Sequence, residues 1–216
     1  MRITLKKPVV IIGALCAAAV ILPVIIVSAY FASQSSVENK MIVADNVIEI
    51  SEEFSPPEEQ YEGENLFKKD VSVTNTGSSP CYVRVYADFS NSFVRSNSYI
   101  SADTDEGALN FYSADRTINS EDEITTFVEY INALDGGWVF VPDDSGTALS
   151  GFYYYREPLN VGETTQSLFT YIKTINITAD DIDQFDILVY AESTQLTDIN
   201  GEAYDDYAAA WTGYLT

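Results

Sequence analysis

Histidine is absent from the 216 residues of the sequence, and cysteine occurs only twice. Without an imidazole, the chain cannot form a Ser-His-Asp triad, a Cys-His dyad or a histidine-ligated zinc centre. Basic residues are also scarce, with 11 Lys and Arg against 33 Asp and Glu and a net charge of −22. Because so few cations cannot neutralise phosphates at scale, the composition excludes nucleic acid as a partner.

Apolar and aromatic residues, in contrast, are abundant. Hydrophobic residues make up 46% of the sequence, which includes 15 Tyr, 11 Phe and 2 Trp. A disordered acidic chain has far fewer. The length fits one folded domain with an additional segment outside it.

The N-terminus supplies that segment. Arg2, Lys6 and Lys7 precede an uncharged run over residues 8–31, which is as long as the ~20 residues that span a bilayer. We predict that residues 1–30 are a signal peptide or a membrane anchor with its basic end in the cytoplasm. Small residues at the outer edge favour cleavage around Ala29, Tyr30 and Phe31, which would make the protein secreted or extracellular at the cell surface. The alternative is a protein that stays membrane-anchored by an uncleaved helix.

The two cysteines fall in different parts of the chain, one in the predicted leader and one in the exported part. Cys16 lies within the apolar run, so Cys81 is the only thiol of the exported body and no intrachain disulfide can form there. We expect Cys81 to be a small buried apolar residue; an intermolecular bridge is the alternative.

Short alternating runs bounded by turn residues predict an all-β fold after the leader. Specifically, we expect a jelly-roll-like β-sandwich with a short C-terminal helix. The expected strands are residues 41–50, 70–75, 82–89, 137–141, 152–155, 167–172 and 186–191, and the expected helix is 204–211. The strands at 137–141 and 152–155 should form a hairpin, and the continuous apolar run at 186–191 predicts a central strand. Residues 51–64 and the long region 90–123 predict loops.

The exported part divides into an N-terminal arm, residues 31–51, and a sandwich domain, residues 52–216. The arm contains a strand-forming run whose candidate donor residues are Ile42, Val43, Val47, Ile48 and Ile50. Such an arm can add to an open sheet edge of the next subunit and so propagate a filament. Alternatively, the run pairs with its own domain as a first strand.

Carboxylates cluster at several places, and all-oxygen clusters suit Ca²⁺ or Mg²⁺. Asp198, Asn200 and Glu202 are the candidate calcium ligands, although their glycine stands at the wrong offset for an EF-hand loop. With 33 carboxylates, a solvated surface is the favoured interpretation, so we expect no cofactor and leave calcium as the alternative. We predict no catalytic residues and no enzyme activity.

Tyr153, Tyr154 and Tyr155 form an aromatic run in an expected strand. Because side chains alternate along a strand, one or two of them should point outward, where they could stack on sugars or anchor a partner protein. We favour the alternative of a cross-strand aromatic ladder that supports the sheet.

The order of several short motifs is informative beyond their composition. After the leader ending in Ser28-Ala29-Tyr30-Phe31 come Val73-Thr74-Asn75-Thr76-Gly77, Cys81-Tyr82-Val83-Arg84-Val85, Gly151-Phe152-Tyr153-Tyr154-Tyr155 and Val189-Tyr190-Ala191-Glu192. This series resembles the TasA/camelysin group of exported Gram-positive proteins, whose leaders are substrates of a dedicated signal peptidase. The resemblance implies a secreted jelly-roll domain and, in the TasA branch, assembly into extracellular matrix fibres. Camelysin-like relatives are described as metalloproteases, a label that the missing histidines argue against.

Three functions follow, in order of preference. The first is an exported structural protein of the bacterial cell surface or biofilm matrix, assembled into fibres by N-terminal strand exchange. The second is a monomeric surface adhesion or binding module, and the third is a cation-dependent hydrolase. The expected partners are further copies of the chain or other matrix subunits, the signal peptidase, and the membrane before processing.

Overall fold

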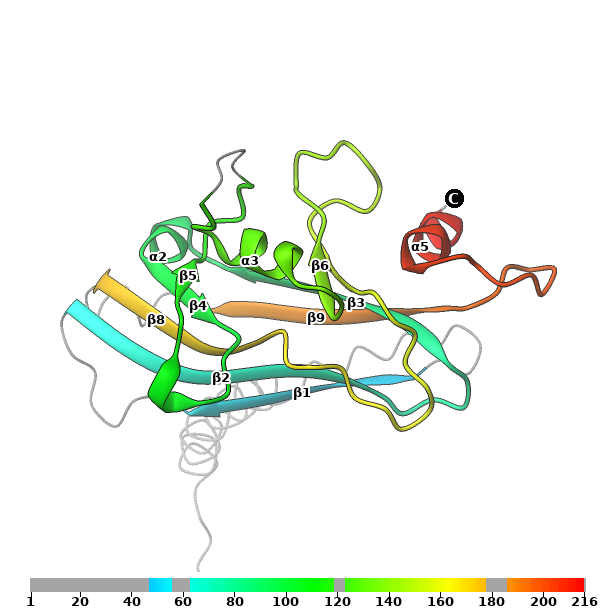
Figure 1. Cartoon of the computed structure of the whole chain (residues 1–216), viewed down its shortest axis with the longest axis horizontal. Coiled ribbons are helices and arrows are strands. Elements are labelled where there is room, and N and C mark those ends of the chain that lie inside the picture. The colour runs from blue at the N-terminus through cyan, green and yellow to red at the C-terminus, as the bar shows by residue number, and fades with distance from the viewer. Residues whose placement is uncertain (1–46, 56–62, 119–122, 178–185, 216) are drawn as a thin grey trace, which may run out of the picture. The chain divides into compact units, whose positions relative to one another are not determined.

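The computed structural model describes residues 47–55, 63–118, 123–177 and 186–215. Within these ranges the strands form two antiparallel sheets, with short helices at their ends and on one outer face (Figure 1).

The larger sheet has five strands in the order β1-β2-β8-β4-β5. Their bounds are β1 Ile48–Ser55, β2 Gly63–Asn75, β4 Ser98–Ser101, β5 Tyr112–Ser113 and β8 Phe169–Ile177. Alternation is clear at the end of β2, where Val71 and Val73 are buried while Ser72 and Thr74 are half-exposed. This period of two turns one face of the strand toward a core.

The smaller sheet has four strands in the order β6-β7-β3-β9. Their bounds are β3 Cys81–Phe89, β6 Trp138–Phe140, β7 Tyr153–Tyr155 and β9 Ile187–Gln195. The turn after β2 is therefore not a hairpin, because β2 and β3 lie in different sheets. The chain crosses between the sheets within the five residues from Thr76 to Pro80.

A single apolar core lies between the two sheets. Its fully buried members include Val71 and Val73 of β2, Val83 and Val85 of β3, and Ile172 of β8. Each side chain of this kind contributes about 1.5–3 kcal/mol when it is fully removed from water. Because successive side chains of a strand point to opposite faces, the residues between the core-facing ones in β3 and β9 point away from the core. They form the outer face of the four-stranded sheet.

The described residues also form four short helical segments: α2 (Ser92–Ser96), the 3-10 helix η1 (Glu106–Ala108), α3 (Phe127–Ala133) and α5 (Tyr207–Leu215). A capping box begins α3, in which the Thr126 hydroxyl accepts from the backbone N–H of Glu129 and the Glu129 carboxylate accepts from the N–H of Thr126. The helix then buries Phe127, Val128 and Ile131 against the core.

The predicted all-β architecture with a short C-terminal helix is confirmed at the level of two antiparallel sheets followed by α5. The predicted hairpin is also confirmed, since β6 pairs with β7 from Trp138↔Tyr155 to Phe140↔Tyr153. Its turn residue Gly146 adopts a positive φ of 68°, which a residue without a Cβ accommodates easily.

Two predicted loops are wrong in part. β1 continues to Ser55 and β2 begins at Gly63, so the ends of the predicted loop 51–64 are strand. Pairing between Glu53 and Asp70 and between Glu52 and Val71 extends the ladder through residues whose composition alone favours a loop. The region 90–123 likewise contains α2, β4 and β5, and β4 lies inside the sheet between β8 and β5.

The prediction of a central strand at 186–191 is wrong. β9 is an edge strand, because among the described residues it pairs only with β3. Its apolar run arises because both of its faces pack. Ile187 and Val189 pack against the core, while Tyr190 joins an aromatic group on the outer face.

Two of the three consecutive tyrosines, Tyr153 and Tyr155, form the expected cross-strand ladder. Tyr153 lies 4.8 Å from Phe140 and Tyr155 lies 5.1 Å from Trp138, measured between ring centroids. The alternative of outward binding residues is wrong for Tyr153 and Tyr154, because both are buried, and Tyr155 is half-buried. Tyr153 is in the core, whereas Tyr154 lies on the outer face under α5, where its ring centroid is 6.0 Å from that of Trp211.

Candidate functional site

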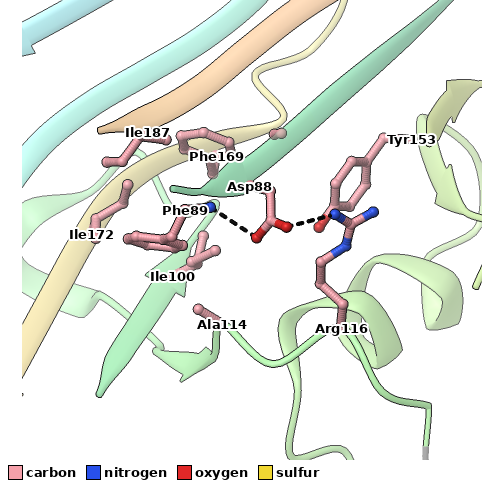
Figure 2. A pocket seen from close by; sticks show the side chains of 10 residues that line it. Asp88, Phe89, Ile100, Ala114, Arg116, Tyr153, Phe169, Ile172 and Ile187 are labelled. Atoms are coloured by element: carbon pink, nitrogen blue, oxygen red, sulfur yellow. Dashed lines mark hydrogen bonds and ion pairs between the residues drawn. The ribbon is translucent and has the colours of Figure 1, made fainter. Parts of the chain in front are cut away.

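A small cavity lies between the sheets at one end of the core, beside an ion pair. Its lining combines apolar side chains with Asp88, Arg116 and Tyr153. In Figure 2, Arg116 lies on one side of Asp88, and the apolar side chains lie on the other: Phe89, Ile100, Phe169, Ile172 and Ile187. The cavity has a volume of about 20 Å³. That volume admits one water molecule, whereas small-molecule sites are typically an order of magnitude larger.

Arg116 ties three segments together beside this cavity. Its Nη1 lies 3.0 Å from Oδ2 of Asp88, and its Nη2 lies 3.2 Å from Oδ1 of Asp143 and 2.6 Å from the carbonyl oxygen of Gly151. The Asp88 carboxylate also accepts from Arg95, at 2.9 Å. A buried charge is tolerated only when it is paired in this way.

The surroundings of the cavity favour the charged form of Arg116 and the neutral form of the Tyr153 phenol. Burial lowers the pKa of Arg116, but Tyr153, Asp143 and Asp88 together raise it above its ordinary value. Burial raises the pKa of Tyr153, against the opposing effect of Arg116. Neither group is thus poised to exchange a proton near neutral pH, as an acid or base catalyst would need to be.

A second arginine is buried on the outer face of the four-stranded sheet. Arg84 Nε and Nη2 both donate to Oε2 of Glu192, with the Nε at 2.7 Å. The guanidinium lies between two rings, 4.0 Å from the centroid of Phe152 and 4.3 Å from that of Trp211. Because the side chain of Trp211 belongs to α5, this stack fastens the C-terminal helix to the sheet.

An aromatic cluster continues along the same face. Tyr86 and Tyr190 stack with centroids 5.0 Å apart and planes 19° apart, and Phe152 meets both rings edge-on at 5.9 Å and 5.8 Å. All three are half-buried. Exposed Leu188 lies two residues from Tyr190 on this face.

The two long edge strands differ in charge. β1 carries Glu49, Glu52 and Glu53, of which the last two pair with Lys69 at 2.7 Å and Lys68 at 2.9 Å. β9 carries one charged residue, Glu192, which is held by Arg84. Charge on an edge discourages the addition of another strand, so β9 is the less protected of the two.

The donor-strand candidates divide between described and other residues. Ile48 and Ile50 belong to β1 and pack against the core of their own domain, and the Val47 carbonyl accepts from the N–H of Thr76 at 2.9 Å. For Val47, Ile48 and Ile50, the structure therefore has the alternative stated above, in which the run pairs with its own domain as a first strand. Ile42 and Val43 lie outside the described residues, as do the leader and the cleavage region Ala29, Tyr30 and Phe31.

The calcium candidates lie together in the turn between β9 and α5. Oδ1 of Asp198 accepts from the backbone N–H groups of Glu202 at 2.9 Å and Asn200 at 2.8 Å. The bond from Glu202, followed by that from the Asn200 side-chain amide, lowers the pKa of Asp198. The carboxylate thus stabilises its own turn. Among the described residues, no group of three or more acidic or cysteine side chains is placed to hold a metal ion.

Cys81 is fully buried at the start of β3, and burial raises the pKa of its thiol to about 11. The predicted role as a small buried residue is confirmed. In the part of the chain that the structure describes, no helix is long and apolar enough to cross a bilayer.

Sequence reasoning missed Arg84 and Arg116. A signal for Arg84 was present, because a chain with only 11 basic residues places one of them in an alternating strand run between two valines. Arg116 offered no such signal, since its partners Asp88 and Asp143 are 28 and 27 residues away.

Comparison of the chain with models of known protein families and with curated proteins finds no match.

Proposed function

We propose that this chain is an exported structural protein of the bacterial cell surface or biofilm matrix, which assembles into fibres by N-terminal strand exchange. It would share its jelly-roll topology, export route and assembly with the TasA branch of the TasA/camelysin group. The observation that carries the proposal is the open and nearly uncharged edge of β9.

Among the described residues, nine-residue β9 pairs only with β3, so its other edge can present a row of backbone groups to an incoming strand. Main-chain hydrogen bonds along such an edge supply affinity, and alternate side-chain positions fix the register. Exposed Leu188 adds apolar area beside the edge, while the single carboxylate, Glu192, is neutralised by Arg84. β9 is therefore suited to accept a strand.

The donor is the segment that precedes β1. Residues 31–46 would span about 50 Å when extended, enough to reach a neighbouring subunit. They include the strand-forming residues Ile42 and Val43, which precede the own-domain pairing that the structure describes from Ile48 onward. Since donor and acceptor are different surfaces, the contact is heterologous and can continue from subunit to subunit.

The small cavity beside Asp88 and Arg116 is too small to serve as a substrate site. Its volume of about 20 Å³ leaves no room for a peptide or sugar beside Asp88 and Arg116. Both charged groups are also committed to holding separate segments together.

Leu188→Glu tests the acceptor edge. We expect the exported protein, recovered from culture medium, to lose fibres in electron micrographs, because a charge on the edge repels the incoming strand. Leu66→Glu is the matched control. It adds the same charge at a similarly exposed leucine (46% against 49%), but in β2, an inner strand of the other sheet, where Leu66 pairs with Lys173 of β8. Equal fibre formation by both variants would contradict a role for the β9 edge.

Deletion of residues 33–46 tests the donor. The leader and all of β1 remain, so the domain should fold and leave the cell as before. We expect soluble monomers by size-exclusion chromatography in place of fibres. Fibres that persist after the deletion would disprove strand exchange by this segment.

The alternative of a monomeric binding module is favoured by the half-buried cluster of Tyr86, Phe152 and Tyr190 on the outer face. Aromatic clusters at protein surfaces serve as anchors for partners. This function would hold if the unmodified exported protein stayed monomeric at all concentrations.

A further inference from the structure

The stacked pair of Tyr86 and Tyr190 is positioned by the register of two strands. Tyr86 of β3 pairs directly with Tyr190 of β9, on the face opposite the core-lining Val85 and Ala191. The ring centroids are 5.0 Å apart and the planes are within 19° of parallel. Two phenols that are held face to face by an antiparallel ladder need little movement for their ring carbons to meet.

Other readily oxidised side chains in the described residues are protected. The Cys81 thiol is fully buried, and its pKa of about 11 leaves almost no reactive thiolate at neutral pH. Trp138 and Trp211 are exposed by no more than 2% of their surface. The two methionines, Met1 and Met41, lie outside the described residues. One-electron oxidation of the folded domain therefore falls on its half-exposed tyrosines.

A second stacked pair provides an internal comparison. The centroids of Tyr112 and Tyr130 are 4.4 Å apart, and the planes are within 14° of parallel. Both rings pack against the core, and Tyr130 also contacts buried Phe127 at 6.2 Å. Tyr86 and Tyr190 do not belong to that core group. They lie on the outer face of the four-stranded sheet, and all four rings are half-buried.

We propose that Tyr86 and Tyr190 are a site of oxidative modification, at which hydrogen peroxide and a haem peroxidase form an intramolecular dityrosine bond. The proposal rests on the export part of the proposed function, which brings the chain into an oxidising environment.

The reaction balances with peroxide as the two-electron oxidant. Each phenol gives up one electron and one proton, and the peroxide is reduced to two water molecules. The two phenoxyl radicals then join through the ring carbons next to their oxygens. The hydrogens on those carbons move to the oxygens, which restores both phenols and leaves the chain two hydrogens lighter.

The bond would replace the disulfide that this body cannot form. It would fasten the edge strand β9 to β3 and close a loop of about 100 residues, which restricts the unfolded chain. On the same loop-entropy argument, the Tm should rise by on the order of 10 °C. The edge of β9 that faces away from β3 stays open, so the modification is compatible with strand addition.

The experiment treats the full-length chain, purified in a mild detergent, with hydrogen peroxide and a haem peroxidase. We expect dityrosine fluorescence in a product that remains monomeric on a denaturing gel, with the peptides of β3 and β9 joined in the mass spectrum. Tyr86→Phe and Tyr190→Phe should each lose the fluorescence and the rise in Tm. Both variants keep the ring, so the stack and the fold are retained. Tyr112→Phe is the matched control and should behave like the unmodified sequence.

Fluorescence that survives in Tyr86→Phe and Tyr190→Phe would overturn the proposal. Cross-links located at Tyr112 and Tyr130, or found only between chains, would also overturn it. The outcome is independent of fibre formation, because it is measured within one chain. A cross-linked chain that fails to form fibres would thus contradict the proposed assembly and leave the modification site standing.

Discussion

Replacement of Arg84 by methionine is expected to lower the free energy of unfolding by about 3 kcal/mol, because it leaves the carboxylate of Glu192 without its partner in a largely desolvated place. The Arg84 side chain is 6% exposed and that of Glu192 is 20% exposed, so water replaces little of the lost pairing. The substitution also removes the cation that lies between Phe152 and Trp211. Urea unfolding followed by tryptophan fluorescence gives the change directly.

The double variant Arg84→Met with Glu192→Met separates the charge effect from packing. With both charges gone, no carboxylate is left unpaired, so the double variant should be more stable than the single one. Lys68→Met is the surface control. It breaks the exposed pair with Glu53 and should change stability far less. A double variant that is less stable than Arg84→Met would contradict the assigned role of the pair.

Phe127→Ala is expected to cost about 3–5 kcal/mol, because the truncation leaves a cavity at the core end of α3. The side chain is 1% exposed, and its ring lies 6.4 Å from that of Tyr153 and 6.5 Å from that of Phe169. These neighbours come from both sheets, so neither can close the gap without moving its strand. The midpoint of urea unfolding should fall accordingly.

Phe93→Ala is the matched control for this change. Phe93 also lies in a short helix, α2, but 51% of its surface is exposed. Its truncation should alter stability by no more than about 0.5 kcal/mol. Equal losses for the two substitutions would show that Phe127 does not anchor the helix to the core.

Some strands were predicted correctly from the sequence and others were missed, and the difference has a physical reason. The runs at 70–75 and 82–89 were predicted correctly because one face of each is buried, which imposes a period of two on the residue types. Residues 51–55 were missed because β1 is an edge strand with its glutamates exposed, and its pairing with β2 leaves no such pattern. The four residues of β4 are too short to show a period at all.

The open edge of β9 could not be predicted from sequence. An apolar run of this kind is typical of a central strand, because central strands are covered on both faces. Here β9 packs against the core on one face and carries Tyr190 in an aromatic cluster on the other, and it still lacks a second neighbour among the described residues. Periodicity records what lies above and below a strand, whereas its neighbours in the sheet are set by topology.

The sequence by itself determined the side-chain chemistry that this protein lacks, the apolar N-terminal run from which export is predicted, and most strands of the two sheets, with β4 and β5 as exceptions. These properties depend on composition and on residues close together along the chain. The tertiary structure alone decided that Arg84 meets Glu192 across 108 residues, that Arg116 is buried among acidic groups, and that Tyr86 stacks on Tyr190. Each of these contacts is made by strand register and sheet packing, which bring distant residues together.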